Sequence, residues 1–149
     1  MRKRFRFAVF LLGAAAAAAT FAGTATADRV YHTERLELTG IGAPGGGMVV
    51  NIHSNGPKIY AHEIYVLRHA VPGTYEVVLT VFSSQNCTGL PTAVIPTAMI
   101  ETNATGNGRA DVKFTPEDVA PFRGTTVSII WTATGPATYA TDCSVVTLD

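Results

Sequence analysis

The chain has 149 residues, and its 11 basic and 11 acidic side chains give a formal net charge of zero. The first 27 residues contain four of the basic side chains and none of the acidic ones, so the other 122 residues carry a net charge of −4. A mildly acidic domain whose sequence shows no basic cluster argues against nucleic acid and anionic membrane surfaces as partners. A length of 122 residues suits one domain with a hydrophobic core.

Residues 1–27 have the pattern of a secretory signal peptide. Residues 2–6 carry four positive charges, residues 7–21 are apolar and rich in alanine, and Ala25-Thr26-Ala27 is a small-x-small cleavage sequence. We therefore expect a mature domain, residues 28–149, without a membrane span and secreted to the extracellular space or the cell envelope. The alternative is an uncleaved anchor helix, for which the apolar run is short because a membrane span needs about 20 residues.

Short alternating runs predict strands at residues 30–38, 48–52 and 59–67. Pro72-Gly73 is a tight-turn pair, since proline presets φ and glycine accepts a positive φ. The clearest strand, residues 75–82, follows this turn. Both of its alternating sets are largely apolar, which indicates a central strand.

The second half of the chain continues in the same manner. Pro96 interrupts one of its runs, which places that strand at a sheet edge or splits it. Asn107-Gly108 is the strongest short turn signal in the chain. Residues 115–118 (Thr-Pro-Glu-Asp) form a helix-start pattern, and Pro121 limits the helix to one turn. The predicted strands are residues 93–102, 110–114, 125–134 and 139–148.

Cys87 and Cys143 are the two cysteines of a chain bound for an oxidising compartment. A disulfide is the natural interpretation, and it would close a loop of roughly 57 residues worth roughly 4 kcal/mol. The alternatives are two free thiols or a metal-binding pair. With about eight short strands and no amphipathic helix, the sequence predicts an all-β fold. We expect an immunoglobulin-like Greek-key β-sandwich of 7–8 strands with one disulfide, after an N-terminal signal helix.

Residues 71–77 (Val-Pro-Gly-Thr-Tyr-Glu-Val) resemble the turn and core strand of fibronectin type III sandwiches. That resemblance implies that Tyr75 is a tyrosine-corner residue. The mature region also resembles uncharacterised secreted proteins of high-GC Gram-positive bacteria, a resemblance that brings no known activity. The features shared with those proteins are Pro72-Gly73-Thr74-Tyr75, Cys87, residues 102–107, Trp131 and residues 143–149.

A metal site is one candidate for function, because His53, His62 and Glu63 fall on neighbouring predicted strands and three ligands suffice for zinc. His53 has the opposite parity to Met48 and Ile52, so we expect it to face solvent. Surface or hydrogen-bonded histidines are the competing interpretation. Copper–zinc superoxide dismutase, a sandwich with one disulfide, needs a His-x-His pair that this sequence lacks.

Other sites find less support in the sequence. The glycine-rich residues 39–47 lack the Lys-Ser or Lys-Thr of a phosphate-binding loop, and no cofactor is predicted. There is no Gly-x-Ser-x-Gly elbow for a nucleophilic serine. An aromatic binding surface is a further candidate, although Trp131 alternates with apolar neighbours and is expected in the core. The aromatic residues in question are Tyr31, Tyr60, Tyr65, Tyr139 and Trp131.

The preferred function is a secreted, monomeric, non-catalytic binding module for an extracellular protein or glycan. Such folds usually keep function in exposed loops on a rigid scaffold. The alternatives are a zinc- or copper-binding protein that uses His53, His62 and Glu63, a small-molecule carrier similar to the neocarzinostatin apoproteins, and a hydrolase.

Overall fold

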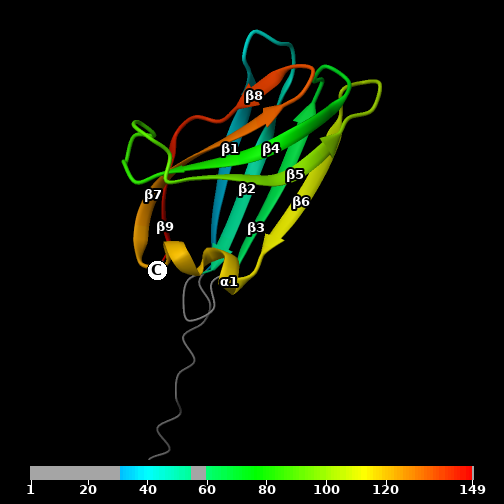
Figure 1. The fold of residues 1–149 in the computed structure, drawn as a ribbon. Coiled ribbons are helices and arrows are strands. Elements are labelled where there is room, and N and C mark those ends of the chain that lie inside the picture. Colours follow the sequence, from blue (N-terminus) through cyan, green and yellow to red (C-terminus); the bar gives the residue numbers. More distant parts are fainter. Residues whose placement is uncertain (1–30, 55–59, 149) are drawn as a thin grey trace, which may run out of the picture.

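A computed structural model describes residues 31–54 and 60–148 (Figure 1). The predicted signal peptide, residues 1–27, lies outside the described residues. In the described part the chain is almost entirely β. The strands are β1 (Tyr31–Gly40), β2 (Gly46–Ser54), β3 (Ala61–Arg68), β4 (Thr74–Phe82), β5 (Ala93–Glu101), β6 (Gly108–Phe114), β7 (Thr125–Thr134), β8 (Thr138–Ala140) and β9 (Ser144–Leu148).

The strands form one antiparallel, nearly closed sheet in the order β5-β4-β7-β8-β1-β2-β3-β6, with β9 paired to β7. The two end strands, β5 and β6, are joined by a hairpin, and a single bridge between Thr102 and Gly108 links them there. The predicted all-β fold with one disulfide is confirmed. Among the described residues, none of the helical segments has the length and apolar character that a membrane span requires.

The core lies between two halves of the curled sheet, where β4 and β5 cross in front of β1, β2 and β3 (Figure 1). Trp131 is fully buried, as its alternation with Val127 and Ile129 predicted. Tyr65 and Tyr139 are also fully buried. The candidate aromatic binding surface is therefore wrong for Tyr65 and Tyr139, which pack in the core with Trp131.

Pro96 lies on an end strand, as expected for a residue that cannot donate a backbone hydrogen bond. The register between β4 and β5 shifts at Val77 and Val78, because Val77 faces Ala98 whereas Val78 faces Pro96. The shift leaves Thr97 as the extra residue of a bulge. Its side chain contributes to the buried polar cluster described below.

The Pro72-Gly73 turn is held to the β5–β6 hairpin. The backbone N–H of Gly73 donates to Thr102 Oγ1 at 2.8 Å, and Thr102 N–H donates back to the Gly73 carbonyl at 2.9 Å. Gly73 has a φ of 154°, and a Cβ at this position would lie 2.4 Å from Pro136 Cγ, so the site requires glycine. Tyr75 donates its hydroxyl to the Val71 carbonyl at 2.5 Å, the hydrogen bond expected of a tyrosine corner.

The predicted disulfide is confirmed: Cys87 and Cys143 are bonded, with 5.8 Å between their Cα atoms. It ties the loop after β4 to the segment that leads into β9. The backbone N–H of Cys87 donates to Ser128 Oγ at 3.0 Å, and Ser128 donates to the Ser84 carbonyl at 2.5 Å. The loop is therefore fastened to β7 by hydrogen bonds as well as by the sulfur bridge.

The predicted single helical turn is also confirmed, as α1 (Pro116–Val119) continued by the 3-10 segment η1 (Ala120–Phe122). Asp118 N–H donates to the Thr115 side chain, and Thr115 N–H donates to the Asp118 carboxylate at 2.8 Å, which completes a capping box. The segment lies across one end of the strands (Figure 1). Val119 is buried there and Phe122 is half-buried.

Candidate functional site

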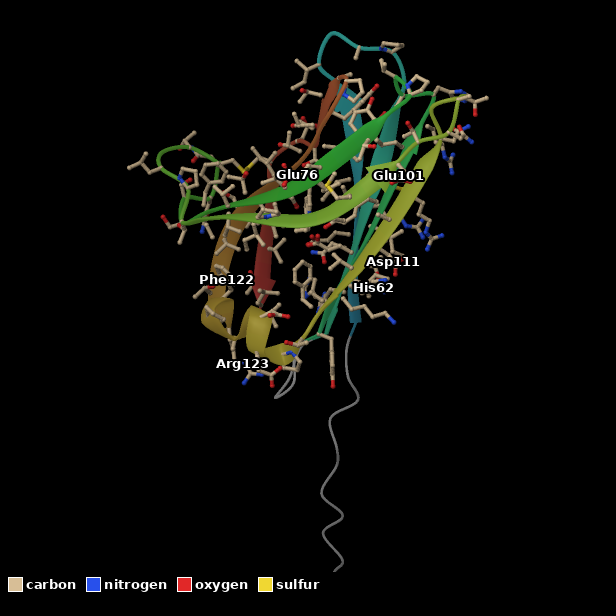
Figure 2. All side chains as sticks on the ribbon, turned by 45° about the vertical axis from the view of Figure 1, so that its right-hand side comes forward. His62, Glu76, Glu101, Asp111, Phe122 and Arg123 are labelled. Carbon is tan, nitrogen blue, oxygen red and sulfur yellow. A yellow bond between two sulfur atoms is a disulfide. The ribbon has the colours of Figure 1, made fainter. Side chains whose placement is uncertain are left out.

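The three predicted metal ligands lie on both sides of one sheet. On β2 and β3, His53 and Glu63 point into the protein, and each is only 3% exposed. His62 points outward, and its Nε2 lies 3.3 Å from Asp111 Oδ2 on β6 (Figure 2). The three side chains therefore do not converge. Within residues 31–54 and 60–148, no group of three His, Cys, Asp or Glu side chains could hold a metal ion.

The prediction that His53 faces solvent is wrong. Both parities of β2 contain apolar residues, so alternation alone could not decide which set faces the core. Val49 and Asn51 turn inward with His53, whereas Met48, Val50 and Ile52 turn outward. His53 stacks on His32 of β1, with 5.3 Å between the ring centroids.

Glu63 is the centre of a buried hydrogen-bond cluster. Its Oε2 accepts a hydrogen bond from Trp131 Nε1 at 2.9 Å and another from the Tyr65 hydroxyl. The Tyr65 oxygen lies 2.8 Å from Thr97 Oγ1, and the Thr97 hydroxyl donates to the Val77 carbonyl at 3.1 Å. The cluster thus connects β3 with β7 and with the β4–β5 pair across the core.

Two more polar side chains extend this cluster along the inner surface. Glu34, Asn51 and Glu63 are successive cross-strand partners on β1, β2 and β3. Burial raises the pKa of Glu63 above its ordinary value, and the hydrogen bonds from Tyr65 and Trp131 offset the rise only in part. Burial likewise raises the pKa of Glu34, against a hydrogen bond from Asn51 and the charge of His32.

The inner polar residues are short of hydrogen-bond donors. Asn51 is 5% exposed, and its Oδ1 is a buried atom without a hydrogen-bond partner in the structure. Glu34 Oε2 is a second buried oxygen without one. Buried acceptors are rarely left unsatisfied in native proteins, and each case calls for an explanation.

A cavity of about 70 Å³ lies beside these residues. Asn51, His53 and Glu63 line one side of it, and α1 and η1 contribute Asp118, Val119 and Phe122 at the end of the strands. The remaining wall is apolar and comes from β3 to β7 and β9. Those side chains are Ala61, Leu79, Val81, Ile95, Phe114, Val127, Ile129, Val146 and Leu148.

The outer surface of β1, β2, β3 and β6 has a different character. A strip of half-buried aliphatic side chains runs along its two middle strands: Met48, Val50, Ile52, Ile64 and Val66. Val50 faces Ile64 and Met48 faces Val66 across the strand pair, so the strip is continuous. We call this strip with its charged border the outer face.

Charged residues border the strip on β1, β3 and β6. Four of the five lysine and arginine side chains in the described residues are exposed there: Arg35, Arg68, Arg109 and Lys113. Glu37 and Asp111 are the acidic side chains that project from the same surface in the described part of the chain. The outer face is therefore cationic overall, although residues 28–149 together carry a net charge of −4.

One end of the outer face is hollowed. Residues 45–47 are all glycine, and an open hollow of about 630 Å³ lies over them. Arg35 from β1 and Arg68 from β3 line it, together with Met48 and Val66 of the strip. A Cβ on Gly47 would lie 1.9 Å from the Val66 carbonyl oxygen, so close approach of β2 and β3 fixes glycine at that position.

The surface of β4 and β5 carries the opposite charge. Glu76 and Glu101 lie there (Figure 2), and both are exposed. Val94 and Met99 of β5 are also exposed, at 59% and 58%. Within the described residues no lysine or arginine lies on β4 or β5, so charge is segregated between the two sides of the molecule.

Sequence reasoning named Glu63 and His53 as metal ligands and Tyr65 as a surface aromatic, but it missed Asn51 and Glu34 on the inner surface. The signal that would have found them is a polar residue at an inward-facing position on each of several adjacent strands. Recognising that signal requires knowledge of which strands pair. No protein-family model matches this sequence, and searches of curated proteins and of solved structures find no match either.

Proposed function

We propose that this chain is an extracellular, non-catalytic binding module that acts as a monomer and docks a protein partner on its outer face. The observation that carries the proposal is the continuous aliphatic strip bordered by Arg35, Arg68, Arg109 and Lys113. Contiguous apolar surface rimmed by polar residues is typical of interaction sites. The partner that fits it is a protein surface with an apolar centre and an acidic rim.

The charge arrangement supports a protein partner of that kind. Arginine is enriched at protein interfaces and binds carboxylates through two parallel hydrogen bonds. A cationic border of this kind also speeds encounter with an acidic partner. The apolar strip distinguishes this surface from a purely electrostatic one, because aliphatic side chains add affinity only against another apolar surface.

Two further features support the extracellular location and the immunoglobulin-like fold that belong to this proposal. The Cys87–Cys143 disulfide suits an oxidising, extracellular compartment, which the signal-like residues 1–27 also predict. The hydrogen bond from Tyr75 to Val71 supports an immunoglobulin-like relationship of the fold.

The test is capture of partners by the immobilised mature domain from envelope and culture-medium fractions of the source organism. The captured proteins are compared by quantitative mass spectrometry among wild type, Arg109→Glu, Val66→Asp and the control Val94→Asp. We expect the two outer-face variants to lose the same acidic protein by at least tenfold, and Val94→Asp to retain it.

Circular dichroism checks that each variant is folded, and Arg109→Glu keeps the test valid if Val66→Asp is unstable. An identical captured set from wild type and Arg109→Glu at low salt would reject the outer face as the docking surface.

A further inference from the structure

We propose that the interior cavity is a second, separate binding site, which takes a small primary amine with a short aliphatic body. The amine head would meet Asn51 and Glu63, and the aliphatic body would lie against the apolar wall. This site is on the opposite side of the sheet from the outer face, and the inference does not depend on the proposed docking function.

The first argument is the chemistry of the polar corner. Asn51 lines the cavity, is 5% exposed, and its Oδ1 has no donor. The Asn51 amide forms a hydrogen bond with the side chain of Glu34, and a carboxylate accepts hydrogen bonds only from the amide nitrogen. Oδ1 is therefore directed away from Glu34 and is available to a donor from elsewhere.

The second argument is that acceptors collect at this corner. Glu63 lines the same cavity, and Glu34 Oε2, next to Asn51, is another buried oxygen without a donor. A protonated amine carries three donors and no acceptor, which complements such a set. A carboxylate ligand would add acceptors to it, and an alcohol would supply only one donor.

The third argument is the shape and polarity of the remaining wall. Leu79, Val81 and Ile95 of β4 and β5 line the cavity together with Val127 and Ile129 of the neighbouring strand β7. Sites for small molecules combine such apolar walls with a few placed polar groups. The volume of about 70 Å³ admits a short chain and not a large ring.

The access route follows from the same lining. Val119 of α1 and Phe122 of η1 contribute to the cavity wall at the end of the strands. This short helical segment is continuous with β6 and β7 through residues 115 and 123–124. A ligand would enter at this end of the strands, past these two side chains, with no strand pair opened.

Trp131 provides a local reporter for the test. It is the single tryptophan of the chain, and its indole N–H donates to Glu63 at 2.9 Å. The mature, oxidised domain is titrated with n-butylamine, n-butanol and butyrate at one pH and ionic strength. The readouts are tryptophan fluorescence and the ¹⁵N–¹H resonance of the indole.

We expect a saturable response to butylamine, at least tenfold weaker binding of butanol, and no binding of butyrate. Asn51→Leu, which keeps the branched side-chain shape but removes both amide atoms, should weaken butylamine binding at least tenfold, and Glu63→Gln should do likewise. Val50→Thr is the matched control, because it is adjacent in sequence but points to the outer face, and it should bind butylamine like wild type.

Equal binding of butanol and butylamine would overturn the assignment of an amine, since the cavity would then select only for apolar bulk. No saturable response to any of the three probes would overturn the site itself. Unchanged butylamine affinity in both Asn51→Leu and Glu63→Gln would place the ligand elsewhere. None of these results bears on partner capture by the outer face, so the two proposals fail separately.

Discussion

The inner and outer surfaces of the β1–β2–β3–β6 sheet are built from alternate residues of the same strands, yet each carries side chains of the kind usually found on the other. The inner surface buries carboxyl and amide groups, which must find hydrogen-bond partners inside the protein. The outer surface leaves aliphatic side chains partly in water, with charged groups around them. Neighbouring positions such as Val50 and Asn51 therefore have reversed roles, since the apolar one is outside and the polar one inside.

The largest contrast should appear when the two neighbouring ionisable residues of β3 are removed in turn. Glu63→Ala leaves Trp131 Nε1 and the Tyr65 hydroxyl without their acceptor, and we expect a loss of about 3 kcal/mol in the free energy of unfolding. His62→Ala removes only a partly exposed pair with Asp111, worth less than about 0.5 kcal/mol.

Urea denaturation at pH 7 measures both values. A loss below about 1 kcal/mol for Glu63→Ala would mean that the buried cluster does not hold the core as the structure indicates.

The pH dependence of stability sharpens the same contrast. Because burial places the folded pKa of Glu63 above that of the unfolded chain, the folded state holds more protons between the two values. Stability should therefore fall as the pH rises from about 4.5, the ordinary pKa, and level off above the folded pKa. The slope is at most about 1.4 kcal/mol per pH unit for this one group.

Glu63→Gln cannot titrate, so its stability should vary less between pH 4.5 and neutrality than that of wild type. Glu34 contributes a slope of the same sign, because burial raises its pKa as well. Unfolding curves at several pH values give the comparison, and parallel profiles for wild type and Glu63→Gln would contradict the assignment.

A smaller effect is expected from the adjacent residues 50 and 51. Asn51→Leu removes a buried acceptor that lacks a donor, but it also removes the amide that hydrogen-bonds to Glu34. The two effects oppose each other, and we expect stability to change by less than about 1 kcal/mol. Val50→Thr keeps the volume of a partly exposed residue and should change stability by less than about 0.5 kcal/mol. Thermal unfolding of both variants beside wild type tests the pair, and a more strongly destabilised Asn51→Leu would show that the Asn51 amide is needed within the protein.

The smallest effect on stability is expected at the border of the outer face. Arg35→Glu reverses one exposed charge and should alter stability by less than about 0.5 kcal/mol. Association with an acidic partner should nevertheless slow severalfold, and the difference should shrink as salt is raised. Surface plasmon resonance at two salt concentrations measures this rate, with Lys113→Ala as a milder companion.

Much of the fold was predictable, and the reasons are local. The Pro72-Gly73 turn, the one-turn helix after Thr115 and the end position of the strand with Pro96 follow from backbone preferences of single residues. The disulfide followed from there being two cysteines in a chain with a signal-like start. These features do not depend on which strands pair.

The candidate sites were less predictable, because they depend on pairing and on the choice of face. The sequence places His62 and Glu63 side by side, and the pleat of β3 sends them to opposite surfaces. For β2, alternation identified two sets of residues but selected the wrong one for the core, since polar His53 and Asn51 turn inward. Such assignments assume that the more apolar set of alternating residues faces the core, and a buried polar residue violates that assumption.

By itself the sequence determined an all-β chain, its turns, its capped helical turn and its disulfide. The first three depend on residues close together in the sequence, and two cysteines can form only one intramolecular disulfide. Only the tertiary structure decided that Arg35, Arg68, Arg109 and Lys113 gather on one surface, and that Glu34, Asn51 and Glu63 line up across three strands inside. Residues far apart in the chain meet through strand pairing, and a shift of one residue in a strand exchanges its two faces.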